Sequence, residues 1–75
     1  MVIAITGNLT LASEIVQLHF RLLGARREIL GEPPERCTVD LREVDAIGVN
    51  AAEMVSCFMR WFRDHHPCGT IELLL

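Results

Sequence analysis

Residues 37–65, CTVDLREVDAIGVNAAEMVSCFMRWFRDH, decide the fold, because one kind of apolar periodicity gives way to another within them. Cys37, Val39 and Leu41 alternate with polar residues, which predicts a strand with one buried face. After a loop over residues 42–49, apolar residues recur at the spacing of one helix face. These residues are Met54, Cys57, Phe58, Trp61 and Phe62. The segment is therefore expected to form a strand and then an amphipathic helix that buries this whole stripe.

Both ends of this helix carry sequence signals. Asn50 stands three residues before Glu53, the spacing of the N-cap and N3 residues of a capping box, with Asn in place of the usual Ser or Thr. At the other end, His65-His66-Pro67 stops the helix because proline cannot continue it. The pattern predicts a helix that Asn50 caps.

The flanking segments supply two more strands and one more helix. Residues 2–6 are rich in β-branched side chains and predict a strand that ends in a turn at Gly7-Asn8. Residues 12–30 show helical apolar periodicity. Residues 69–75 alternate again and predict the last strand.

The first helix has two candidate caps, and its end is expected to fray or turn near Gly31, because Gly24 interrupts the pattern. The hydroxyl of Thr10 or of Ser13 is expected to cap its start. Residues 32–35, Glu-Pro-Pro-Glu, cannot continue a helix and form a stiff surface connection. The expected helical stripe is Ile15, Leu18, His19, Leu22 and Arg26, with Val16, Phe20 and Leu23 beside it.

The order β-α-β-α-β predicts a small α/β fold, a single domain over residues 1–75 with a mostly parallel sheet. Right-handed crossovers between neighbouring parallel strands put both helices on one face of the sheet. The strands alternate instead of being apolar throughout, which indicates that the other face is uncovered. The residues expected on that face are Thr6, Thr38, Asp40, Thr70 and Glu72.

Composition argues against several classes of function. Seven arginines, with no lysine, are outnumbered by ten acidic residues, for a formal net charge of −3. The basic surplus that nucleic-acid binders use against phosphate is therefore missing. Three cysteines make an odd number, which argues against a disulfide framework and for reduced thiols. No apolar run approaches the roughly 20 residues of a membrane span. We expect a cytoplasmic protein with neither a membrane span nor a nucleic-acid partner.

The second half of the chain resembles the STAS family, the sulfate-transporter and anti-sigma-factor-antagonist domains. Val39-Asp40-Leu41 matches the family's central strand, Val44 and Ile47 match the hydrophobic residues of its following loop, and a helix opens at the equivalent point.

The first half adds to this resemblance. Residues 5–18, ITGNLTLASEIVQL, are similar to the family's segment before its first helix, with Gly7 and Leu9 aligned. The resemblance covers most of the chain. The chain is short and lacks the later helices of typical family members, so the resemblance implies that its last strand is an open edge. The resemblance also implies a STAS-like fold and a regulatory module that binds another protein, such as a kinase-type anti-sigma factor.

The helix start departs from the family pattern. STAS domains that act as phosphorylation switches carry Asp-Ser-Ser-Gly or Asp-Ser-Thr-Gly there. Aligned on Ile47, this chain has Gly48 in place of the Asp and Val49 at the phosphoacceptor serine, followed by Asn50 and Ala51. The resemblance thus implies a member that is not phosphorylated at this site. The expected partner-binding residues are Gly48, Val49, Asn50, Ala51, Ala52 and Glu53.

Two other functions remain open from the sequence. A short chain with an open last strand would suit a self-assembling subunit, a homo-oligomer within a larger complex. His65, His66 and Cys68 could instead belong to a small thiol- or metal-dependent enzyme. However, structural zinc needs a second pair of ligands, and a catalytic thiol needs an oriented base. We therefore expect no catalytic residue, no metal and no cofactor.

Overall fold

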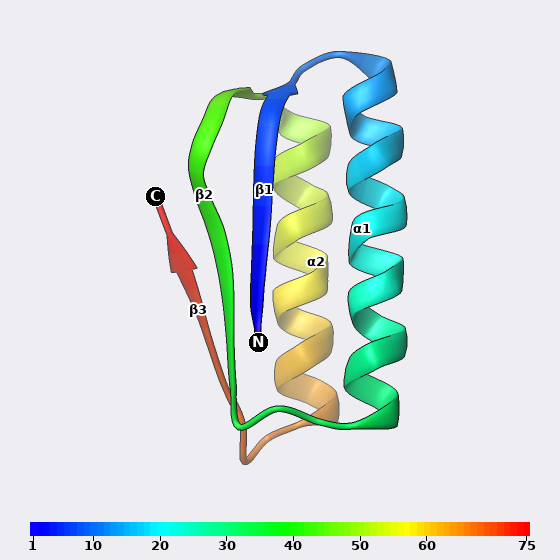
Figure 1. Ribbon diagram of the computed structural model, residues 1–75, viewed down its shortest axis with the longest axis vertical. Coiled ribbons are helices and arrows are strands. Elements are labelled where there is room, and N and C mark those ends of the chain that lie inside the picture. The colour runs from blue at the N-terminus through cyan, green and yellow to red at the C-terminus, as the bar shows by residue number, and fades with distance from the viewer.

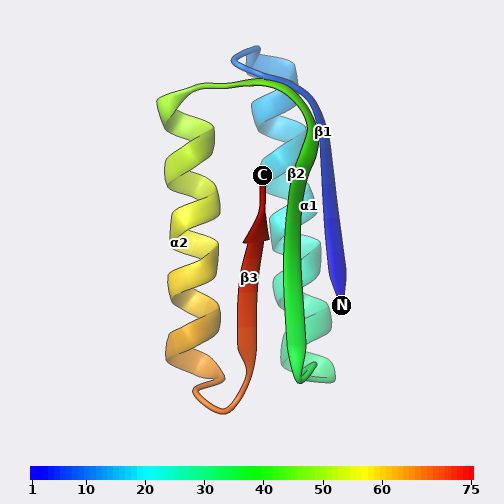
Figure 2. The ribbon, with the colours of Figure 1, turned by 90° about the vertical axis from the view of Figure 1, so that its left-hand side faces the viewer.

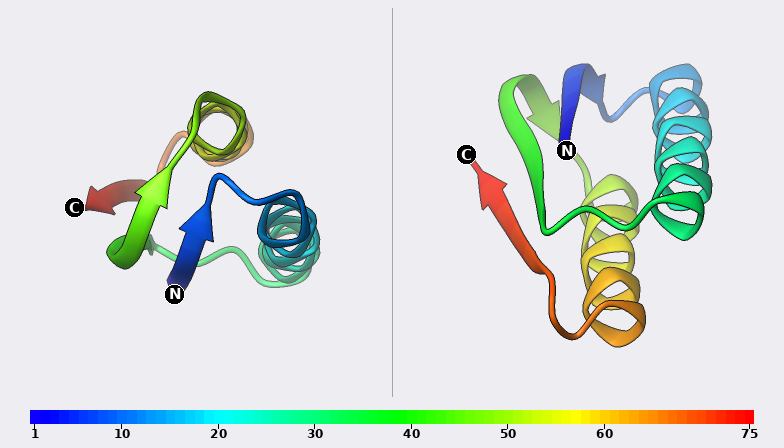
Figure 3. Two further views of the ribbon diagram at one scale, coloured as in Figure 1. Left: turned by 90° about the horizontal axis from the view of Figure 1, so that it is seen from above. Right: turned by 60° about the horizontal axis from the view of Figure 1, so that its bottom comes forward.

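The computed structural model describes all 75 residues and contains three strands and two helices (Figure 1). In chain order these are β1 (Val2–Leu9), α1 (Ala12–Gly31), β2 (Arg36–Ile47), α2 (Val49–His65) and β3 (Thr70–Leu74). The strands form one parallel sheet in the order β1-β2-β3 (Figure 2). Both helices lie on the same face of that sheet (Figure 3, left). The predicted β-α-β-α-β fold is confirmed, and the sheet is parallel throughout.

Strands β1 and β2 are longer than their sequence patterns predicted. β1 continues through Gly7-Asn8, where a turn was predicted, and β2 continues through the predicted loop as far as Ile47. Two register shifts, between Ala4 and Thr6 and between Gly7 and Asn8, each place one extra residue in β2. Such bulges bend the strands and let pairing continue. Gly7 has a φ of 96°, which glycine adopts without the Cβ clash of other residues. The Gly7-Asn8 signal therefore marks a bulge and not the end of the strand.

The hydrophobic core fills the space between the sheet and the two helices. The sheet contributes Ile3, Ile5, Leu9, Cys37 and Val39, α1 contributes Leu18, Leu22, Ala25 and Ile29, and α2 contributes Ala51, Val55, Phe58 and Phe62. Phe58 and Phe62, the largest of these side chains, are completely buried. The predicted aromatic core of the second helix is thus confirmed for both phenylalanines.

Cys57, which was predicted to pack with them, is exposed. With 3.6 residues per turn, Cys57 lies about 100° around the helix from Phe58, beyond the edge of the buried face. Ala51 and Val55 instead face the core with Phe58. The buried face of α2 is therefore turned relative to the predicted face, which included Cys57 and omitted the small residue Ala51.

Neither predicted side chain caps α1. Its N-cap residue is Leu11, with no side-chain hydrogen bond to the helix start. Asn8 accepts hydrogen bonds from both the backbone N–H and the hydroxyl of Thr10. The Thr10 hydroxyl is therefore engaged in the turn before the helix, and Ser13 already lies inside it.

The predicted Asn50 cap of α2 is also wrong. The N-cap residue is Gly48, and no side chain caps the helix. Because β2 extends to Ile47, only one extended residue separates strand from helix. Asn50 consequently lies within the first turn, where the predicted capping box with Glu53 cannot form.

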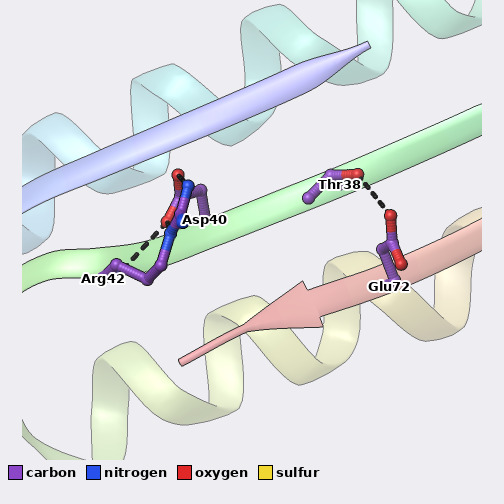
Figure 4. A network of polar contacts seen from close by, with 4 residues as sticks. All are labelled: Thr38, Asp40, Arg42 and Glu72. Carbon is purple, nitrogen blue, oxygen red and sulfur yellow. Dashed lines mark hydrogen bonds and ion pairs between the residues drawn. The ribbon is translucent and has the colours of Figure 1, made fainter.

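The face of the sheet opposite the helices carries two polar pairs (Figure 4). Thr38 Oγ1 donates to Glu72 Oε1 at 2.9 Å and so links β2 to β3. Arg42 Nη2 donates to Asp40 Oδ2 at 2.9 Å within β2. Strand β3 pairs only with β2, so the predicted open edge is confirmed.

Candidate docking surface

The segment Gly48–Glu53 lies where β2 ends and α2 begins, next to the end of β1. The backbone N–H of Gly48 donates to the Leu9 carbonyl at 3.4 Å. A Cβ added to Gly48 would lie 3.8 Å from Thr10 Cγ2, so the loop after β1 runs directly beside the helix start. Open α/β sheets bind their ligands at the carboxyl ends of the strands, which is the edge described here.

Three large apolar side chains are exposed at this junction. Val49 is 75% exposed, Leu11 is 51% exposed and Ile47 is 43% exposed. They belong to the first residue of α2, the β1–α1 loop and the end of β2, respectively. We call Leu11, Ile47 and Val49 the helix-start patch. A single exposed apolar residue is ordinary on a protein surface, but three on adjoining segments form a surface suited to a partner.

The six predicted partner-binding residues are divided between surface and core. Ala51 is completely buried and packs in the core, so it cannot contact a partner. Val49 and Ala52 are exposed and lie on the outer side of the first helical turn. Gly48 is half-buried against the end of β1. Of the small and apolar residues predicted to form the surface, Val49 and Ala52 remain its accessible members.

Asn50 and Glu53 line a groove of about 400 Å³ between α1 and α2. The other lining residues are His19, Leu22, Leu23, Arg26, Met54 and Cys57. All eight residues were named in the patterns of their own helices, but nothing in the sequence placed the two sets side by side. No periodicity within one helix could connect His19 and Arg26 with Asn50 and Glu53, because only the packing of the two helices does so.

Arg26, which lines this groove, packs against an aromatic ring. Its Cζ lies 5.3 Å from the centroid of the Trp61 ring, within the range of a cation–π interaction. The Arg26 Nε is buried and has no hydrogen-bond partner within the chain. Arg26 forms no ion pair with Glu53, so the groove is lined by a basic and an acidic side chain that do not pair, together with apolar side chains.

The two histidines at the far end of α2 pack against aromatic rings of the same helix. His65 Nδ1 lies 2.9 Å from the Trp61 carbonyl oxygen, and the two rings stack with centroids 5.1 Å apart. The His66 ring packs against Phe62, with centroids 5.4 Å apart, while Cys68 is exposed. No three His, Cys, Asp or Glu side chains lie close enough together to hold a metal ion.

The pKa values of Cys37 and Asp40 are displaced from their ordinary values. Burial raises the pKa of the Cys37 thiol above its ordinary value, which keeps it protonated and unreactive. Hydrogen bonds from Arg42 lower the pKa of Asp40. Both groups lie on β2, away from the helix-start patch, and both have structural explanations.

Comparisons with models of known protein families, with curated proteins and with solved structures find no match to this chain. The STAS resemblance therefore rests on the sequence alone and stays a prediction. Neither helix is long and apolar enough to span a lipid bilayer.

Proposed function

We propose that this chain is a STAS-like interaction module that docks a cytoplasmic regulatory protein through the helix-start patch and the adjoining Ala52. The kind of partner that the resemblance implies is a kinase-type anti-sigma factor. The observation that carries the proposal is the 75% exposure of Val49 at the first residue of α2. Covering exposed apolar surface contributes about 25 cal/mol for each Å² removed from water. The patch therefore favours a partner with apolar side chains of its own.

The backbone supports the same choice of partner. The first N–H groups of a helix have no carbonyl partner within it, and the helix start carries partial positive charge. At α2 these groups lie beside exposed Val49, and no side chain caps them. A partner loop that brings a carbonyl or carboxylate oxygen together with apolar side chains would satisfy both features.

The absence of a hydroxyl distinguishes this module from a phosphorylation switch. Val49 and Asn50 offer no phosphoacceptor where the resembling family has serine or threonine. Ala51 also faces the core, so that position could not receive a phosphate even as serine. Docking is therefore expected to be constant and independent of phosphorylation at this site.

The groove beside the patch gives the interface a polar margin. Asn50 and Glu53 are one turn or less from Val49 and line the groove with Arg26. Interfaces commonly combine an apolar centre with a polar, solvent-accessible rim. A partner centred on Val49 would reach these side chains at its edge.

The proposal is tested by affinity capture from extracts of the protein's own host, with mass spectrometry of intact complexes. The unmodified chain should retain one protein at fixed stoichiometry, and Val49→Arg and Ala52→Arg should each abolish its retention. Both positions are exposed, so circular dichroism should show that the variants remain folded. The matched control is Ser56→Arg, which adds the same charge at an exposed position farther along α2.

Retention of the same partner by Val49→Arg would refute docking through this patch. Identification of the retained protein as one with a kinase-type nucleotide-binding domain would support the implied partner. Release of the partner after incubation of the complex with ATP, together with an increase in the intact mass of this chain, would contradict the constant interaction.

A further inference from the structure

The side of α1 that faces away from the sheet carries a second apolar stripe. Val16, Phe20 and Leu30 are 53%, 64% and 62% exposed, Leu23 is half-buried between them, and Arg27 completes the row. We call these five residues the outer stripe. They recur at spacings of four, three, four and three, the pattern of a helix that packs along another helix. The sheet and α2 lie on other sides of α1 (Figure 1), and of these five residues only Leu23 also lines the groove between the helices.

Gly24 leaves room for another backbone beside the outer stripe. It lies in the interior of α1, where glycine lowers helix stability relative to alanine. An added Cβ would meet no atom within 4 Å, so the fold of the single chain gives no reason for glycine here. Gly24 follows Phe20 by one helical turn and therefore borders the outer stripe. A helix without a side chain at this point allows close contact with a second helix.

We infer that a second copy of this chain packs on the outer stripe, with the two α1 helices antiparallel. A two-fold axis at Leu23 would place Arg27 of one copy beside Phe20 of the other, where the guanidinium can lie over the aromatic ring. Arg27 takes no part in the ion pair or the cation–π contact within the chain. The same axis brings Val16 of one copy against Leu30 of the other.

Charge decides the orientation of the pair. A parallel arrangement would put Arg27 against Arg27 and Phe20 against Phe20, so two like charges would meet in an apolar contact. The antiparallel arrangement instead gives each Arg27 an aromatic face. The interface is closed, because the same surface is used on both copies and no further copy can add.

This dimer does not depend on the proposed docking function, because the outer stripe shares no residue with the helix-start patch, and only Leu23 of the stripe also lines the groove beside that patch. It also uses a different surface from the open β3 edge that the sequence indicated for self-assembly.

The stripe extends over about 21 Å of helix. A standard stable interface buries roughly 800 Å² on each partner, and one helix face supplies less than that. We therefore expect a weak dimer that dissociates in the micromolar range.

Sedimentation equilibrium of the full chain from low to high micromolar concentration tests the inference. The unmodified chain should pass from monomer to dimer, and Phe20→Glu should weaken association by roughly tenfold or more. Gly24→Leu should act similarly by blocking close approach, although the single chain has open space for the added side chain. Ser56→Glu, at an exposed position of α2, is the control and should leave the dimer unchanged.

Disulfide trapping tests the orientation in a background with the exposed thiols removed by Cys57→Ser and Cys68→Ser. A mixture of Val16→Cys and Leu30→Cys chains should form the mixed cross-link in preference to the Val16→Cys self cross-link. A monomer at all concentrations, or a dimer unaffected by both Phe20→Glu and Gly24→Leu, would overturn the inference. Cross-linking of Val16→Cys mainly to itself would overturn the antiparallel arrangement.

Discussion

Among single residues, the three cysteines occupy environments that their sequence positions only partly indicate. Cys37 is completely buried in the sheet, whereas Cys57 and Cys68 are exposed. The helical stripe had placed Cys57 in the core. The difference arises because burial depends on which side of α2 meets the sheet, and that side is centred on Val55 and Phe58.

This difference predicts the reactivity of the thiols. A disulfide reagent that titrates thiols at pH 8 should react rapidly with two thiols of the folded chain, Cys57 and Cys68. Cys37 should react only after unfolding, because burial both shields the thiol and raises its pKa. Cys57→Ser should reduce the number of rapidly reacting thiols from two to one. Rapid titration of a single thiol in the unmodified chain would contradict the placement of Cys57, and a strongly accelerated Cys68 would favour the enzymatic alternative.

Asp40 should make stability depend on pH in the acidic range. Arg42 lowers the pKa of Asp40 in the folded chain, chiefly through side-chain hydrogen bonds. This stabilisation is fully present above the unfolded-state pKa of about 3.9 and is lost as pH falls through the lower folded-state value. The difference in unfolding free energy between the unmodified chain and Asp40→Asn should therefore narrow below pH 4. Urea unfolding from pH 7 to pH 2.5 measures it, and a difference independent of pH would contradict this role of the ion pair.

Among the elements, β3 is the shortest and lies at an edge of the sheet. Strand β3 has five residues, pairs on one side only and leaves no residue fully buried. Its hydrogen bond from Thr38 to Glu72 joins it to β2 across the uncovered face. Thr38 is only 7% exposed, so its hydroxyl depends on this partner.

A double-mutant cycle should reveal this dependence. Glu72→Ala is expected to lower the unfolding free energy by about 1 kcal/mol, because it leaves the buried Thr38 hydroxyl without an acceptor. The same substitution should have a smaller effect in a Thr38→Val background, where no donor remains to be satisfied. Urea unfolding of the four chains provides the values. Equal effects of Glu72→Ala in both backgrounds would show that the hydrogen bond contributes nothing.

In the molecule as a whole, the two helices cover one face of the sheet, and each helix buries one of its own sides. Only 14 of the 75 residues are buried, which leaves apolar side chains on the outer stripe and in the helix-start patch. A domain of this size buries a smaller share of its surface than a larger one does. Both proposed interactions use surface that the fold itself leaves uncovered.

The sheet topology predicts an order of local stability. β2 is paired on both sides and lies over the core, whereas β3 is a short edge. Hydrogen exchange followed by NMR should show the slowest amides in β2, with β3 amides exchanging roughly tenfold faster or more. The control is α1, whose buried side should resemble β2. Equal protection of β2 and β3 would mean that the chain opens only as one unit.

The sequence by itself determined the order of the elements and most of the core. The alternation from Cys37 to Leu41 and the spacing of Phe58 and Phe62 are local patterns. Each follows from the geometry of its own strand or helix and does not depend on where that element lies in the fold. The right-handed crossover rule then put both helices on one face of the sheet.

Only the tertiary structure decided the features that depend on two segments meeting. Pairing with β1 turned the predicted loop before Ile47 into strand, and this extension made Gly48 the N-cap in place of Asn50. The direction in which α2 meets the sheet buried Ala51 and exposed Cys57.

The candidate surface was likewise only half visible in the sequence. Val49 was identified from the helix start, but Leu11 lies near it only because the end of β1 is beside the start of α2. Arg26 lines one groove with Asn50 and Glu53 only because α1 packs on α2. These contacts join residues far apart in the chain, and a local periodicity carries no information about which distant segment will lie opposite it.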